Sequence, residues 1–151
     1  MKATFGAGCF WQVEEAFRTV PGVRSTAVGY MGGTIKKPTY EQVCTDMTGH
    51  VEVCQVDYDP KKVSYDKLLN IFWKIHDPTQ LNRQGVDRGT QYRSVIFYHN
   101  ESQKKSALHS TSEQQKKYRD TIVTEIKKAA TFYPAEEYHQ KYLQKKGLKT
   151  C

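Results

Sequence analysis

The spacing of apolar residues predicts alternating strands and helices, beginning with a strand over residues 2–7. After Gly8, four apolar residues recur at intervals of three and four, as they do along one face of a helix: Phe10, Val13, Phe17 and Val20. This spacing predicts a helix that begins at Cys9 and buries that face. Three polar residues of the same helix are expected to point to solvent: Glu14, Glu15 and Arg18.

The middle of the chain continues the alternation. Residues 23–31 are rich in Val, Thr and Tyr, which predicts a strand, and a single helical turn is expected at 40–44. Residues 51–58 alternate with a period of two and predict a further strand. The strand face that carries Glu52 also carries three apolar residues: Cys54, Val56 and Tyr58. An acidic side chain is therefore expected among apolar neighbours.

The second half of the chain begins with a helix that Ser64 is placed to cap and that runs to about residue 75. Residues 76–94 have no periodicity, and a loop of that length inside a compact domain is usually functional. The remaining expected elements are a strand at 94–98, a helix at 100–118, a strand at 121–127, and a helix at 135–146 with Pro134 in its first turn and Gly147 as its C-cap.

These elements predict a single α/β (α+β) domain over residues 1–151, with 147–151 as a mobile C-terminal tail. The net charge of +7 includes several lysine pairs, which solvated helix faces explain, because no aromatic residues alternate with them as base stacking requires. No apolar run is long enough for a leader peptide or a membrane helix. We expect a cytoplasmic protein that binds neither nucleic acid nor membranes.

Cys9 is the first candidate for chemistry. Unpaired backbone N–H groups at a helix N-terminus favour a thiolate, which makes a cysteine nucleophilic. Phe10 and Trp11 follow it directly and could wall a small apolar pocket beside the sulfur. From the residues alone, a packing role for all three stays open. Four cysteines are too few for a disulfide-dense scaffold, which favours thiol chemistry.

Glu52 is the second candidate. Burial would raise its pKa and equip it as a general acid, although pairing with an arginine would also explain an acid on this strand face. Tyr40 and Tyr92 are weaker candidates, because the chain has ten tyrosines and most tyrosines serve packing. His139 is expected to be a surface or packing residue, with a position at the border of the site as the lesser alternative.

The remaining cysteines raise two further questions. Cys44, His50 and Cys54 lack the spacing of a closed zinc site, so we expect no metal. Cys151 lies in the expected tail, where a thiol can swing to another sulfur and resolve a sulfenic acid. A harmless terminal cysteine is an equally good interpretation of Cys151 from the residues alone.

Eight short motifs carry a resemblance to a known family. They are Gly-Cys-Phe-Trp at 8–11, Pro-Gly-Val at 21–23, Gly-Tyr-Met-Gly-Gly at 29–33, Pro-Thr-Tyr at 38–40, Thr-Gly-His-Val-Glu at 48–52, His-Asp-Pro-Thr-Gln at 76–80, Gly-Thr-Gln-Tyr-Arg-Ser at 89–94 and Glu-Tyr-His-Gln-Lys-Tyr-Leu at 137–143. In this order and over nearly the whole chain, they resemble peptide methionine sulfoxide reductase A.

The resemblance implies a two-layer α/β sandwich with a ferredoxin-like core and a shallow site. It implies reduction of methionine S-sulfoxide, free or in proteins, and thus repair of oxidised proteins. The implied roles are Cys9 as nucleophile, Phe10 and Trp11 as the pocket for the substrate methyl, Glu52 as the acid that protonates the sulfoxide oxygen, Tyr40 and Tyr92 as its hydrogen-bond donors, and Asp87 beside them.

The same resemblance implies how the enzyme is recycled. Attack on sulfur leaves Cys9 as a sulfenic acid, a disulfide then forms, and thioredoxin or another dithiol such as glutaredoxin or dithiothreitol reduces it. Family members often continue past the position of Cys151 into a glycine-rich tail with another cysteine, whereas this sequence ends at Cys151. We therefore expect a single-step exchange from Cys9 to Cys151 in place of a relay through a second tail cysteine. Cys44 and Cys54 are the competitors of Cys151. No bound cofactor is implied, and we expect a monomer.

Two further points qualify the resemblance. Gln12 stands where the family commonly has glycine, which alters the pocket rim. A thiol peroxidase would also use a nucleophilic cysteine and a resolving thiol, and a basic nucleic-acid-binding module would not need Cys9. Activity on methionine sulfoxide with dithiothreitol separates these three classes.

Overall fold

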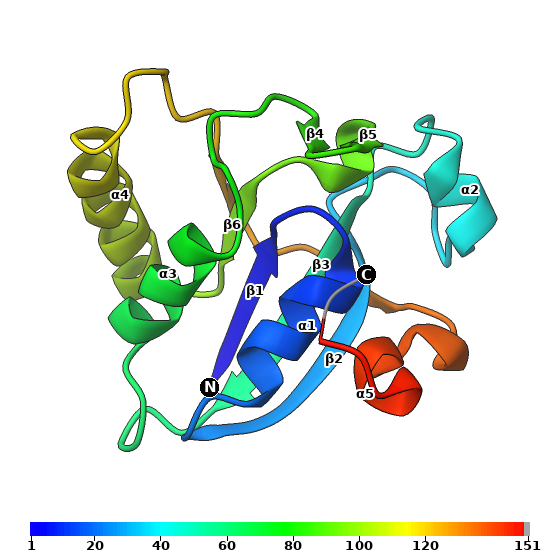
Figure 1. Cartoon of the computed structure of the whole chain (residues 1–151), viewed down its shortest axis with the longest axis horizontal. Coiled ribbons are helices and arrows are strands. Elements are labelled where there is room, and N and C mark those ends of the chain that lie inside the picture. Colours follow the sequence, from blue (N-terminus) through cyan, green and yellow to red (C-terminus); the bar gives the residue numbers. More distant parts are fainter. Residues whose placement is uncertain (150–151) are drawn as a thin grey trace.

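The computed structural model describes residues 1–149, and within them the main sheet has six strands (Figure 1). In spatial order these are β7 (Glu125–Lys128), β6 (Val95–Tyr98), β1 (Lys2–Gly6), β3 (Val51–Tyr58), β2 (Val23–Met31) and β8 (Tyr133–Pro134). Neighbouring strands are antiparallel, except that β6 and β7 are parallel.

The helices of the described chain are α1 (Phe10–Arg18), α2 (Tyr40–Cys44), α3 (Tyr65–Lys74), α4 (Glu101–Gln115) and α5 (Tyr142–Lys146), with 3₁₀ turns η1 (Thr90–Tyr92) and η2 (Glu137–His139). In chain order, β1-α1-β2-β3-α3-β6 fill the sheet order β6-β1-β3-β2, which is the split βαβ arrangement of a ferredoxin-like core. Helix α4 then leads to β7, which runs parallel to β6. The expected ferredoxin-like α/β fold is confirmed.

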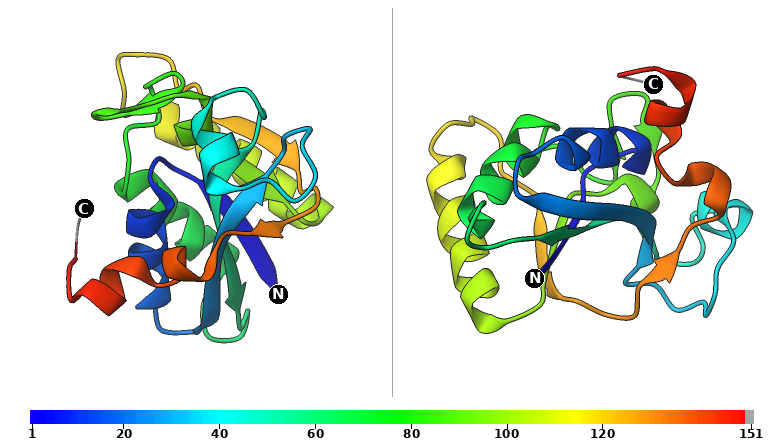
Figure 2. Two further views of the ribbon diagram at one scale, coloured as in Figure 1. Left: turned by 90° about the vertical axis from the view of Figure 1, so that its right-hand side faces the viewer. Right: turned by 90° about the horizontal axis from the view of Figure 1, so that it is seen from below.

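The sheet is buried on both faces. Helices α1 and α3 cover one face, where the ring of Phe5 lies 5.1 Å from that of Phe17 and 5.3 Å from that of Phe72. The other face carries a smaller apolar cluster, covered by the segment that contains Ala129 and Phe132 (Figure 2). Because β1 and β3 are antiparallel neighbours in the middle of this sheet, the residues after β1 lie beside the first residues of β3, at one end of the two strands.

Glu14 does not point to solvent as the sequence predicts. Its side chain is buried, and its carboxylate accepts hydrogen bonds from the hydroxyl of Thr26 at 2.8 Å and from the backbone N–H of Lys141 at 2.6 Å. The prediction was wrong because the C-terminal segment packs on this side of α1, which the periodicity of α1 alone does not reveal.

The expected helix over 135–146 was also wrong in its first half. Pro134 belongs to β8 and pairs with Gly29, residues 137–139 form the 3₁₀ turn η2, and the α-helix begins only after Lys141, which has a left-handed φ of 53°. The carboxamide of Gln140 holds this segment against β2: it accepts from the N–H of Val28 at 2.9 Å and donates to the carbonyl of Val28 at 2.8 Å. This side chain thus replaces a strand neighbour for β2. Gly147 does cap α5, with a φ of 68°.

The long loop at 76–94 contains a short hairpin, β4 (Arg83–Gln84) and β5 (Asp87–Arg88), before η1. The carboxamide of Gln84 bonds both the N–H and the carbonyl of Asp77, which anchors the hairpin to the end of α3. The expected strand at 121–127 begins later, at Glu125, because Val123 bonds the carbonyl of Pro78 in this loop.

No helix in residues 1–149 is both long enough and apolar enough to cross a bilayer.

Replacement of Gln140 by alanine is expected to lower the free energy of unfolding by about 1–3 kcal/mol, because the N–H of Val28 loses its partner and the Val28 carbonyl is left with the N–H of Ala135. Urea unfolding followed by circular dichroism measures the change. Gln144→Ala is the matched control, since Gln144 is exposed on α5. Equal stability of the two variants would contradict a structural role for the Gln140 carboxamide.

Candidate active site

Cys9 lies at the N-cap of α1, and its carbonyl accepts from the N–H groups of Gln12 and Val13 at 3.2 and 3.4 Å. The turn that brings it there needs Gly8, whose φ is +90° and where a Cβ would lie 2.9 Å from the side chain of Gln84. The side chain of Cys9 is partly exposed, and the helix N-terminus favours its thiolate. The predicted nucleophile thus has a suitable position.

Glu52 is 1% exposed, and its Oε1 accepts from the backbone N–H of Phe10 at 3.3 Å. Within residues 1–149 its Oε2 has no hydrogen-bond partner. Burial raises the pKa of Glu52 to about 8; the Phe10 N–H opposes this rise and the charge of Asp87 adds to it. The carboxyl therefore holds its proton at neutral pH, beside the residue that follows Cys9.

Tyr40 and Tyr92 come from separate segments, α2 and η1, and both approach Glu52. Burial is the main cause that raises the pKa of each hydroxyl. A hydrogen bond with Cys44 and the charge of Glu52 raise the pKa of Tyr40 further. The charges of Glu52 and Asp87 do the same for the pKa of Tyr92. Both hydroxyls therefore stay protonated at neutral pH and can donate hydrogen bonds.

The two aromatic residues after Cys9 differ in exposure. Phe10 is buried, with its ring 5.8 Å from Tyr30 and 6.4 Å from Tyr40, whereas Trp11 is partly exposed. The Trp11 indole stacks on Tyr142 with ring centroids 3.7 Å apart. Phe10 thus packs in the core as well as under the site, and Trp11 presents apolar surface beside Cys9.

His139 contributes to the site, which the sequence gave only as the lesser alternative. It is fully buried, its Nδ1 accepts from the Trp11 indole N–H at 2.9 Å, and its ring lies 4.4 Å from that of Tyr40. Burial lowers its pKa, which keeps the ring neutral. Sequence reasoning missed Tyr142 and Glu136 entirely, because their contacts depend on the fold of the C-terminal segment; only the Glu-Tyr-His-Gln-Lys-Tyr-Leu motif marked this region.

The other cysteines are placed differently. Cys54 is fully buried in the core, and burial holds its pKa well above the ordinary value, whereas Cys44 is exposed at the end of α2. Cys151 lies outside the described residues. Among residues 1–149 no three His, Cys, Asp or Glu side chains form a group that could hold a metal ion.

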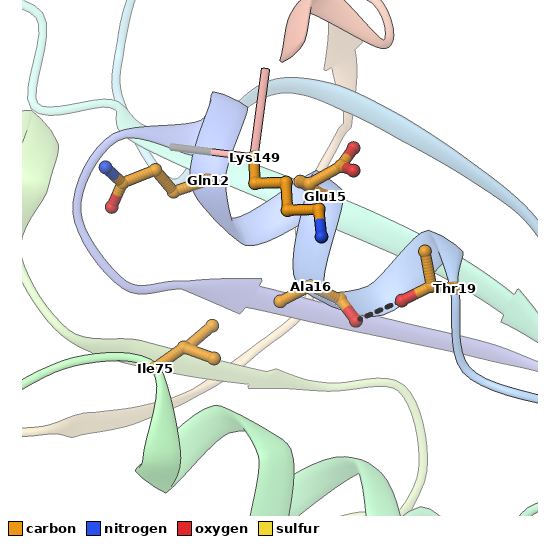
Figure 3. Close-up of a pocket in the computed structure, with 6 residues that line it drawn as sticks. All are labelled: Gln12, Glu15, Ala16, Thr19, Ile75 and Lys149. Atoms are coloured by element: carbon orange, nitrogen blue, oxygen red, sulfur yellow. Dashed lines mark hydrogen bonds between the residues drawn. The ribbon is translucent and has the colours of Figure 1, made fainter. Parts of the chain in front are cut away.

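A groove of about 510 Å³ lies along α1, between it and the residue that follows α3, Ile75 (Figure 3). It is lined by Gln12, Glu15, Ala16, Thr19, Ile75 and Lys149. The groove places Lys149, near the end of the described chain, against the same helix whose N-cap is Cys9.

Comparisons with known proteins agree with this geometry. A family model described as peptide methionine sulfoxide reductase matches residues 1–151. The peptide methionine sulfoxide reductase MsrA of Methanothermobacter thermautotrophicus is 60% identical over 152 residues, which cover 99% of this chain and 90% of that protein.

Two solved structures of Mxr1 from Saccharomyces cerevisiae are similar. The reduced form has a TM-score of 0.94 at 38% identity and covers 100% of this chain and 88% of that one. The complex with Trx2 has a TM-score of 0.67 at 27% identity and covers 94% and 84%. Sequence, fold and site together place this chain in the peptide methionine sulfoxide reductase family.

Proposed function

We propose that the chain reduces methionine S-sulfoxide, free or in proteins, by attack of the Cys9 thiolate on the sulfoxide sulfur. The observation that carries this assignment is the buried Glu52 carboxyl, protonated at neutral pH and bonded to the N–H of the residue after Cys9. The nucleophile at the N-cap of α1 and the proton donor on β3 are therefore held close together by this hydrogen bond. This combination suits transfer of an oxygen atom that needs a proton as it leaves sulfur.

The Cys9 sulfur gains the oxygen and is oxidised to a sulfenic acid, the methionine sulfur is reduced by two electrons, and the proton of Glu52 goes to the transferred oxygen. Tyr40 and Tyr92 donate hydrogen bonds to that oxygen while charge develops on it, with Asp87 beside them. Trp11 and Phe10 contact the substrate methyl, which selects a sulfoxide over a hydroperoxide.

The resolving step is assigned to Cys151. Lys149 lies along α1 in the groove with Gln12, which is one helical turn from Cys9. Residues 150 and 151 extend the chain from Lys149 by at most about 7 Å. Attack of the Cys151 thiol on the sulfenic acid gives a disulfide and water. Buried Cys54 is poorly suited to this role, and exposed Cys44 is the stronger competitor.

We assign reduction of the disulfide to a thioredoxin, in preference to a glutaredoxin. The complex of the related Mxr1 with Trx2 supports this choice. We further propose that the protein is a monomer, with a single domain over residues 1–151, and that it works in the cytoplasm without a bound cofactor.

Cys9→Ser is expected to abolish reduction of methionine S-sulfoxide with dithiothreitol, because a serine hydroxyl is too basic and too weak a nucleophile toward sulfur. Circular dichroism should show an unchanged fold. Substrate loss is followed by chromatography, with hydrogen peroxide as the competing substrate. Retained turnover in the variant would remove Cys9 from the mechanism, and faster reduction of peroxide by the wild type would favour a thiol peroxidase.

Glu52→Gln keeps the shape of the side chain but cannot deliver a proton, so kcat is expected to fall by about 10²–10⁴ at neutral pH. Wild-type activity should decline as the pH rises through about 8, where Glu52 loses its proton, and the variant should lack this decline. More than half of the wild-type activity in the variant would assign the proton to another group.

A stability measurement checks the pKa independently of activity. The folded-state pKa of Glu52 lies above the ordinary value of about 4.3, so its contribution is fully present below that value and is lost as the pH rises to about 8. Glu52→Gln should therefore raise Tm relative to the wild type at pH 9 more than at pH 4. An equal change at both pH values would contradict the raised pKa.

Cys151→Ser is expected to form one methionine per enzyme in a single turnover without reductant, because attack precedes disulfide formation. Multiple turnover with thioredoxin should collapse, and small thiols should restore it in part. Mass mapping of the oxidised wild type is expected to find a Cys9–Cys151 disulfide. A disulfide from Cys9 to Cys44 or Cys54, or normal thioredoxin-dependent turnover of the variant, would make Cys151 a bystander.

A further inference from the structure

Glu136 joins three segments that are distant in the sequence. Its Oε1 accepts from the hydroxyl of Tyr30 on β2 at 2.9 Å, and its Oε2 accepts from the backbone N–H of Tyr40, the first residue of α2, at 2.9 Å. Both carboxylate oxygens are thus occupied by donors from different elements. Because Tyr30 is fully buried in the sheet, one end of this bridge is rigid.

Helix α2 is short, and its far end is held separately, because Asp46 accepts from the N–H and the hydroxyl of Thr90. It has five residues, and its capping box is internal, between Thr39 and Gln42. A helix this short is marginal by itself and depends on tertiary contacts. Val43 is the one buried residue that the helix contributes to the core. The contact of Glu136 with the N–H of Tyr40 therefore ties the start of α2 to the sheet.

The main chain of Glu136 also contributes to the position of Tyr40, through His139. Its carbonyl accepts from the N–H of His139 at 2.9 Å, and the His139 ring lies 4.4 Å from the ring of Tyr40. One residue thus holds both the backbone of Tyr40 and the ring that packs against it.

The Glu136 carboxyl is ionised at neutral pH. Burial acts to raise its pKa, but the N–H of Tyr40, its own backbone N–H and the Tyr30 hydroxyl outweigh burial and hold the pKa below the ordinary value. A charged acceptor makes stronger hydrogen bonds than a neutral one. The bridge from Tyr30 to Tyr40 is therefore well suited to fix a position.

We propose that Glu136 is a positioning residue for the reaction, which holds the Tyr40 hydroxyl where it donates to the sulfoxide oxygen. This inference rests on the role of Tyr40 in the proposed function. Glu136 itself acts through Tyr40, because both of its carboxylate oxygens already bond Tyr30 and Tyr40.

A double-mutant cycle tests the inference, with Glu136→Ala, Tyr40→Phe and the double variant assayed for kcat and KM on methionine S-sulfoxide with dithiothreitol. Each single variant is expected to lose about tenfold or more in kcat, since hydrogen bonding to the oxygen strengthens in the transition state. The double variant should be no slower than Tyr40→Phe, because without the hydroxyl its position no longer matters.

Conservative variants separate positioning from a general loss of structure. Glu136→Gln can still accept from the Tyr40 N–H and donate to the Tyr30 oxygen, so it should keep kcat within about twofold of the wild type. Glu136→Asp keeps the charge but is one methylene too short to reach both donors, so it should behave as Glu136→Ala and replaces that variant in the cycle if alanine prevents folding. Glu137→Ala is the matched control, because Glu137 is exposed.

The outcomes separate the two levels of the proposal. Additive losses in the double variant, or a Glu136→Gln variant as slow as Glu136→Ala, would overturn the inference and leave the proposed function intact. Wild-type kcat in Tyr40→Phe would overturn the role of Tyr40 and the inference with it, while Cys9→Ser and Glu52→Gln would still test the chemistry.

Discussion

The hydrogen bond from the N–H of Phe10 to the carboxyl of Glu52 connects the start of α1 to the middle of the sheet. It satisfies one of the helix N–H groups that α1 cannot use internally, and it gives a buried carboxyl one of its few partners. The same contact sets the distance between the thiol of Cys9 and its acid. The site depends on this contact, because it joins the helix that begins after Cys9 to β3, which is paired with β1 on one side and β2 on the other.

Around this fixed centre, the structure adds groups from segments that the chain reaches later. Residues 133–142 pack against β2 and α1. Polar side chains hold them there by bonding backbone groups, as Gln140 does for Val28. The buried Glu14 accepts from the same segment. The aromatic wall of the site, from Trp11 through His139 to Tyr40, is assembled only where this segment is in place.

Periodicity predicted the elements whose apolar faces repeat over several turns or residues, which is why β2, β3 and α3 match the expected ranges. It also predicted that Glu52 is buried, since a strand of alternating residues has two defined faces. It could not predict the contacts of Glu14 or Gln140, because these side chains are polar and bond partners more than 100 positions away in the sequence. Cys9 and Glu52 were candidates from helix position and strand face alone, whereas the family motifs were needed to single out Tyr40 and Tyr92, since ten tyrosines give no pattern by themselves.

The place of the C-terminal segment has a consequence for biosynthesis. Residues 1–98 contain all four strands and both helices of the ferredoxin-like core, so this part can collapse while the ribosome is still adding the rest. The Tyr30, Glu136 and Tyr40 contacts span about a hundred residues, and such non-local contacts form late. A nascent chain therefore carries its reactive thiol before it has the surroundings that direct that thiol to a substrate, an interval in which unselective oxidation competes with maturation.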